Sequence, residues 1–309
     1  MNMNIKKLFI AALLLSLQSC LVFGVPGEQE AKLWEILKRS LLEKTPTDSL
    51  QDLQSIVPEK LPINYVGPLH LYAPTEGTII NFIALKAEPG KLLNHLRYLL
   101  SLPLKQEDIN TYCPNYGTPL STIIWNLGKT TTESVETELE KIKLLLKNGA
   151  QVNILMKERG LTDERENELH RVVEPIISIL TKKLRRLVPT RRKKPRQEDR
   201  EKLIDAVLEV VQLLVEHGVD EKHRNAKEET PLDKLKNALN GQKKIAEKTK
   251  ISIIEKFEAS IRKAIERKAE EEERLQFLQK LQKGRLLPGE TQIFPKNRPT
   301  VKAPKWTFN

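Results

Sequence analysis

The stretch from Tyr116 to Asn153 constrains the fold more than any other part of the chain, because it predicts two short helices joined by a reversing loop. Thr118 can cap the first helix, since its hydroxyl accepts a hydrogen bond from an otherwise unsatisfied backbone N–H. Pro119 then falls at the first helical position, where a missing N–H costs nothing. Apolar residues recur at helical spacing in both helices: Leu120, Ile123, Ile124 and Leu127 in the first, and Leu139, Ile142, Leu145 and Leu146 in the second.

The two predicted helices need a neighbour. A polar run from Gly128 to Ser134 separates them, and Asn148-Gly149 ends the second, because glycine adopts the left-handed conformation without a Cβ penalty. Neither helix is long enough to be stable alone, so the pair is expected to bury its apolar faces on another unit. This logic predicts a stacked repeat and directs attention to further copies in the chain.

Two copies carry a family resemblance. Thr-Pro-Leu at 118–120 followed by Leu-Leu-Leu-Lys-Asn-Gly-Ala-Gln-Val-Asn at 144–153 resembles the ankyrin repeat. The second copy has Val-Gln-Leu-Leu-Val-Glu-His-Gly-Val-Asp at 211–220, then Arg224-Asn225, then Thr-Pro-Leu-Asp at 230–233. From Gly218 to Leu232 the spacing fits the family's linker without gaps.

Two weaker copies are placed around them. One opens at Gly77-Thr78, has its second helix at Leu92 to Leu100 and ends at Asn110. The other opens at 167–172, where Leu-His survives but Thr-Pro is lost, and takes 207–217 as its second helix. Gly117 lies one place nearer Thr118 than is usual, and Glu228 stands where glycine is common. The resemblance covers roughly 75–239. It implies an all-α fold, an ankyrin-repeat solenoid of about four degenerate helix pairs with helical N- and C-terminal extensions.

Residues 1–24 predict an export signal. Lys6-Lys7 precede an apolar run, Leu8 to Leu17, that is too short to span a bilayer. Leu-Gln-Ser-Cys at 17–20 resembles a bacterial lipobox, which implies lipidation of Cys20, and ordinary cleavage after Gly24 is the alternative. We therefore expect a protein exported from the bacterial cytoplasm, lipid-anchored in the periplasm or outer envelope, or secreted. Either cleavage leaves Cys113 without an intramolecular partner, so no disulfide framework exists.

The remaining segments follow in order. Residues 25–74 form a helical and irregular lead-in, with an amphipathic helix from Glu28 to Leu42. The repeats occupy 75–245. A long charged helix follows at 246–284, and its stretch from Arg267 to Arg274 is expected to be solvent-exposed or paired in a coiled coil. Residues 285–309, with four prolines and no periodicity, predict a disordered tail.

A basic insertion at 182–196 concentrates much of the net charge of +11. It holds nine cations and no acidic residue, which suits phosphates or anionic lipid headgroups. A solvated loop is the first interpretation, a membrane or acidic-protein contact the second. Nucleic acid is third, because no aromatic residue is interleaved and the export signal removes the chain from the cytoplasm. The cations are Lys182, Lys183, Arg185, Arg186, Arg191, Arg192, Lys193, Lys194 and Arg196.

The sequence offers no catalytic, cofactor or metal residues. None of the five histidines forms a His-Glu-x-x-His pair, and none has a cysteine at zinc-ligand spacing, although His217 and His223 are close in sequence. His217 precedes a helix-ending glycine and is expected to cap that helix. The resemblance implies structural hydrogen bonds for His170. Cys113 has no activating histidine nearby in sequence and is predicted to be an inert thiol. A non-enzymatic protein is therefore expected; titratable groups converging on His170 or His223 would argue for an enzyme.

The resemblance implies a function. Ankyrin stacks bind other proteins on the concave surface built from the finger loops and the first helix of each pair, so we expect a monomeric protein-binding scaffold, with a lipid anchor or a host-directed role as further options. The alternative is an electrostatic tether to an anionic membrane or polymer through 182–196. For the tyrosines among the candidate contacts, packing on the adjacent finger is the competing interpretation. The candidates are Tyr112, Asn115, Tyr116, Met156, Lys157, Arg224 and Lys227.

Overall fold

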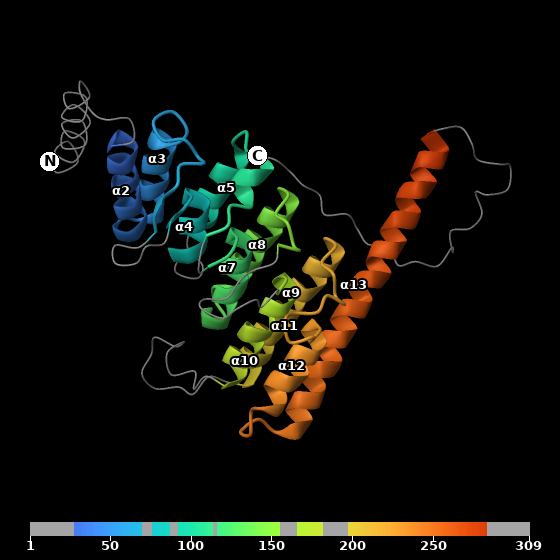
Figure 1. The fold of residues 1–309 in the computed structure, drawn as a ribbon. Helices are drawn as coiled ribbons and strands as arrows, with labels where there is room; N and C mark the ends of the chain where they lie inside the picture. Colours follow the sequence, from blue (N-terminus) through green and yellow to red (C-terminus); the bar gives the residue numbers. More distant parts are fainter. Residues whose placement is uncertain are drawn as a thin grey trace. The chain divides into compact units, whose positions relative to one another are not determined.

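The computed structural model describes residues 28–69, 76–86, 92–113, 116–154, 166–181 and 197–282, and this part of the chain is mostly helical (Figure 1). The chain divides into two compact units, Met1–Ala264 and Ile265–Asn309, which are taken separately below. The predicted export signal, the basic insertion at 182–196 and the predicted tail at 285–309 lie outside the described residues.

The first unit contains most of the elements. Its first part holds α2 (Glu28–Glu43), α3 (Pro46–Ile56), β1 (Gly67–Pro68), β2 (Glu76–Gly77), α4 (Ile79–Lys86), α5 (Leu93–Ser101) and α6 (Gln106–Ile109). It continues with α7 (Pro119–Asn126), the 3-10 helix η1 (Leu127–Lys129), α8 (Val135–Lys147), α9 (Glu168–Arg171), α10 (Val173–Thr181), α11 (Gln197–Glu216) and α12 (Pro231–Asn240). The last helix, α13 (Glu247–Gln282), begins in this unit and continues into the second.

Local chemistry sets where these helices begin and end. Thr118 accepts a hydrogen bond from Ser121 N at the start of α7, and Thr230 forms a reciprocal capping box with Asp233 at the start of α12. Proline follows each threonine at the first helical position. At the other ends, Gly149 and Gly218 have φ of 92° and 88°, the left-handed conformation predicted for Gly149.

The helices of the first unit pack in two rows. The first row contains α4, α7, α9 with α10, and α12, each in contact with the next (Figure 1). The second row contains α3, α5, α8 and α11, again in contact one after another. Within each pair, α4 contacts α5, α7 contacts α8, and α10 contacts α11. Each short helix therefore buries its apolar face on two or three neighbours, which compensates for its low stability alone.

The N-terminal end of the core is closed by α2. Trp34 is fully buried, and its Nε1 donates a hydrogen bond of 3.0 Å to Pro68 O in β1. Its ring also meets Phe82 of α4 edge-on, with centroids 6.2 Å apart. Gly67 permits this approach, because a Cβ there would lie 2.7 Å from Trp34 Nε1.

The structure corrects three sequence expectations. The lead-in after Thr45 contains an 11-residue helix, α3, capped by Thr45 and opened by Pro46. The helix predicted from Val207 begins ten residues earlier, at Gln197, because its first turns are polar and lack the apolar period that marks a helix. Two short antiparallel strands, β1 and β2, were not predicted and pair Gly67 with Gly77.

The second unit is described only through Gln282, as the C-terminal half of α13. Every described side chain from Ile265 to Lys280 is exposed except the half-buried Phe277. Arg267 to Arg274 are exposed in the single chain, which fits both predicted alternatives, exposure to solvent and pairing in a coiled coil. Across the described chain, no helix combines the length and the apolar character needed to cross a bilayer.

Candidate protein-binding surface

The turn before α7 presents the first candidate contacts. Cys113 and Gly117 exchange two backbone hydrogen bonds of 2.9 Å, and Gly117 has φ of 80°. Tyr112 is 38% exposed, as expected of a contact residue. Tyr116 is not: its side chain is half-buried and packs against the hydrophobic core.

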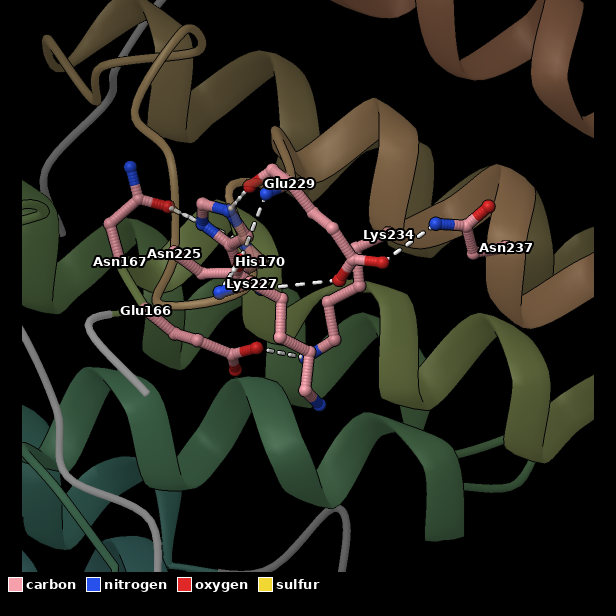
Figure 2. Close-up of polar contacts among 8 residues, drawn as sticks. All are labelled: Glu166, Asn167, His170, Asn225, Lys227, Glu229, Lys234 and Asn237. Atoms are coloured by element: carbon pink, nitrogen blue, oxygen red, sulfur yellow. Dashed lines mark hydrogen bonds and ion pairs between the residues drawn. The ribbon is translucent and has the colours of Figure 1, made fainter. Parts of the chain in front are cut away.

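The turn before α12 presents two more (Figure 2). Buried Asn225 organises it, because its Oδ1 accepts hydrogen bonds from the backbone N–H groups of Lys227 (2.9 Å) and Glu229 (3.0 Å). Arg224 is exposed, and its Nη1 donates to Glu228 O. The side chain of Lys227 is exposed as well, so both predicted cations of this turn face solvent.

These turns precede different helices of the first row, with α9 and α10 between them in the row. The structure therefore presents Tyr112 on one turn and Arg224 with Lys227 on another. Asn115, Met156, Lys157, all nine cations of 182–196 and Cys20 lie outside the described residues.

Trp125 is a candidate contact that our sequence reasoning missed. It lies on α7 and is 39% exposed. The Nζ of Lys129 stands 3.5 Å from the centroid of its ring, a cation–π contact. The sequence could have predicted its exposure, because Trp125 lies outside the apolar stripe formed by Leu120, Ile123, Ile124 and Leu127.

The neighbouring helix fixes the backbone beneath this tryptophan. Ser178 of α10 donates a hydrogen bond of 3.1 Å to Gly128 O in η1. A Cβ at Gly128 would lie 3.0 Å from Ser178 Cβ and 3.2 Å from Pro175 Cα, so α10 packs closely on η1. An exposed ring on a firmly packed helix loses little freedom on binding, which suits an interface anchor.

Two asparagines tie successive turns together in the same way. Asn110 Nδ2 donates to Gly149 O (3.1 Å), and its Oδ1 accepts from Gln151 N (2.7 Å). Asn153 Nδ2 donates to Gly218 O (2.9 Å), and its Oδ1 accepts from Asp220 N (3.0 Å). Each amide thus bridges the residue that ends the next second-row helix and the residue two places beyond it. We call these contacts the amide bridges.

His170 forms a buried joint between α9 and the turn before α12 (Figure 2). Its Nδ1 lies 2.8 Å from Asn167 Oδ1, and its Nε2 lies 2.9 Å from Glu229 O. Burial lowers the pKa of His170 and outweighs the Glu229 carbonyl and the Glu166 carboxylate, which raise it. The ring is fully buried and lies within hydrogen-bond distance of two acceptor oxygens, and a neutral imidazole, with its single N–H, donates to one of them. This placement suits the structural role that the resemblance implies.

Titratable groups do surround this joint, as an enzyme would require. Glu166 is buried and forms an ion pair with Lys234, and the ring of His223 lies 5.8 Å from that of His170. Glu229 Oε1 accepts from Asn237 Nδ2 at 2.6 Å (Figure 2). These contacts connect α9, α12 and the turn before α12, and they bury the imidazole rather than present it to a substrate.

Glu168, beside this joint, is a buried acid. Its Oε1 accepts from Ser121 Oγ of α7 at 3.3 Å, while no hydrogen-bond partner meets its Oε2. Burial raises the pKa of Glu168 to about 8, against weaker lowering by Ser121 and Arg171. The carboxyl is therefore largely protonated at neutral pH, between two helices of the first row.

Two other predictions about titratable groups can be compared with the structure. Burial raises the pKa of Cys113 to about 11, which keeps this thiol protonated at neutral pH. His217 Nδ1 lies 2.8 Å from Leu213 O, so His217 caps the end of α11 as expected. Among the described residues, no cluster of histidine, cysteine, aspartate or glutamate has the arrangement of a metal site.

A groove of about 480 Å³ lies between α8 and α11. Its rim carries carboxylates that are largely paired: Glu136 with Lys202, Asp205 with Lys256, and Glu209 with Lys143. Glu198 and Glu201 line the groove as well, so its lining is acidic. The exposed aromatic residues Tyr112 and Trp125 lie on the first row and its turns, and we therefore place the candidate binding surface there.

Comparison with known proteins adds no name to this surface, because no family model and no curated protein matches the chain.

Proposed function

We propose that this chain is an exported, non-enzymatic ankyrin-repeat scaffold that binds another protein through the first-row helices and the turns before them. The observation that carries the proposal is the exposed Trp125 with Lys129 over its ring, on a helix between two others of the same row. Tryptophan is enriched among residues that dominate binding energy.

The repeat assignment is supported by contacts that recur along the chain. The amide bridges of Asn110 and Asn153 have the same donor and acceptor pattern. Thr118 and Thr230 cap their helices in the same way before proline. Recurring contacts between successive helix pairs are the physical basis of a repeat stack, in which each unit is stabilised by its neighbours.

The test uses the mature chain with a photo-crosslinking amino acid in place of Trp125, exposed to proteins of the source cells or of a host. A specific protein is expected to crosslink at position 125. Trp125→Ala should weaken its retention at least about tenfold, because an anchoring tryptophan contributes about 2 kcal/mol or more. Leu42, 58% exposed on α2, is the matched control position for both crosslinking and alanine substitution.

Equal retention by Trp125→Ala, Leu42→Ala and the native chain would contradict the proposal. Salt separates it from the alternative, a tether through 182–196. Capture on anionic lipid vesicles that disappears between low and moderate salt, and that Trp125→Ala leaves unchanged, would favour the tether. Retention that resists salt and depends on Trp125 would favour the scaffold.

A further inference from the structure

The C-terminal half of α13 presents an exposed apolar and charged stripe. Ile265, Leu275 and Leu278 are 43%, 49% and 43% exposed. Ile265, Lys268, Glu272 and Leu275 follow one another at alternating spacings of three and four residues, so they share one helix face. This is the spacing of a coiled-coil seam, with a lysine and a glutamate between two apolar positions.

The sequence of this stripe is complementary to its own reverse. When two copies are set antiparallel about Glu270, the four seam residues pair as Ile265 with Leu275 and Lys268 with Glu272. The charged pair occurs once on each side of the axis, and each time it joins opposite charges. Seam positions of antiparallel coiled coils pair in this way, the first apolar position of one helix against the second of the other.

We propose that the face of α13 formed by Ile265, Lys268, Glu272 and Leu275 is a self-association surface, on which two copies of this chain pair antiparallel. The occupant is a second copy because charge complementarity selects that partner and that direction. In a parallel pair, Lys268 would face Lys268 and Glu272 would face Glu272. Glu271, close to the axis, has a counter-ion on its own helix, since Arg274 Nη1 lies 3.4 Å from Glu271 Oε2.

Lys268 and Glu272 are also four residues apart on one helix, where such pairs stabilise a single exposed helix. That rival explanation needs no second copy. The two explanations differ in one respect. If the ion pair forms within one helix, a charge reversal is compensated only by the second reversal in the same chain. If it forms between chains, mixing the two single variants compensates it as well.

The experiment is sedimentation equilibrium of the mature full-length chain over a concentration series. The native chain is expected to form dimers. Lys268→Glu and Glu272→Lys should each weaken dimerisation at least about tenfold, because each puts like charges opposite one another twice. An equimolar mixture of the two variants should recover the native affinity as a heterodimer. Lys263→Glu, the same charge change on the opposite face, should dimerise like the native chain.

A native chain that stays monomeric throughout the series would overturn the proposal, as would a mixture no better than the separate variants. Dimers that both single variants leave intact would place self-association elsewhere. Circular dichroism checks that the helix persists, which is expected because all the changed positions are exposed. The scaffold proposal is tested at Trp125 and stands or falls independently.

Discussion

The second-row helices α8 and α11 hold equivalent places but bury opposite chemistry. Both end at a glycine with positive φ, Gly149 and Gly218. Counted back from these glycines, Glu138 and Lys141 of α8 occupy the positions of Val207 and Val210 in α11. All four side chains are buried, and Lys141 Nζ meets Glu138 Oε1 at 2.8 Å. Both helices therefore bury the side chains at these two positions. The two side chains of a helix can be either oppositely charged or both apolar.

The first-row helices α7 and α9 differ in the same sense. Thr118 caps α7, and Asn167 caps α9 through its side-chain oxygen. The next position is Pro119 in α7 and the buried acid Glu168 in α9. The two helices therefore start with the same geometry but with different residues, and α9 adds a titratable group to the interior. Each prediction below changes a residue at which two corresponding elements differ or agree.

The largest effect is expected from breaking the buried ion pair of α8. Lys141→Val should lower the free energy of unfolding by about 3–5 kcal/mol, because it removes the cation that meets the buried carboxylate of Glu138. Adding Glu138→Val gives α8 the valines of α11 and should restore the native stability or exceed it. Denaturant titration measures both. Lys143→Ala, at a side chain 40% exposed, is the control and should cost about 1 kcal/mol or less.

The second effect depends on pH and belongs to α9. The pKa of Glu168 is raised from its ordinary 4.5 to about 8, so its protonated form stabilises the fold fully below pH 4.5. That contribution is lost as pH rises through 8, with a slope of up to about 1.4 kcal/mol per pH unit. The stability of Glu168→Gln relative to the native chain should therefore increase as pH rises from 4.5 to 8. Parallel stability curves for the two proteins would show that Glu168 titrates normally.

The amide bridges should be equivalent, although the pairs that they join are not. Asn153→Ala and Asn110→Ala should each lower the free energy of unfolding by about 1–3 kcal/mol, since each removes two hydrogen bonds to the backbone and one such bond contributes about 0.5–1.5 kcal/mol. Asn94→Ala, an exposed asparagine on α5, should change it by about 0.5 kcal/mol or less. An effect confined to one bridge would show that the two turns are not built alike.

The smallest effect is expected in the turn before α12. Glu228 has φ of 60°, whereas the turn before α7 uses glycine at its positive-φ position, Gly117. Glu228→Gly should raise the free energy of unfolding by up to about 1 kcal/mol, because the left-handed conformation strains a side chain more than it strains glycine. Gly117→Ala should act in the opposite direction. Thermal unfolding of the two variants checks both signs.

Features encoded within a few residues were predictable from the sequence. The Thr-Pro starts of α7 and α12 and the glycine that ends α8 rest on neighbours in the chain, and the structure confirms them. The amide bridges were not predicted, because Asn110 and Asn153 bind partners 39 to 67 residues away. For the candidate surface, exposure was predicted correctly for Tyr112, Arg224 and Lys227 and wrongly for Tyr116, which is half-buried against the core.

Asp220 binds residues near both ends of the connection between α8 and α9. Its backbone N–H donates to Asn153 Oδ1, and its carbonyl accepts from Asn167 Nδ2 at 2.8 Å. Asp220 thus holds both Asn153, which follows α8, and Asn167, the N-cap of α9. Because Asp220 holds both Asn153 and Asn167, the two ends of the connection are fixed. The entropy cost of closing the connection then rises only slowly with its length. Evolution or an engineer can lengthen, shorten or replace that connection, or insert a reporter there, without redesigning the helices on either side.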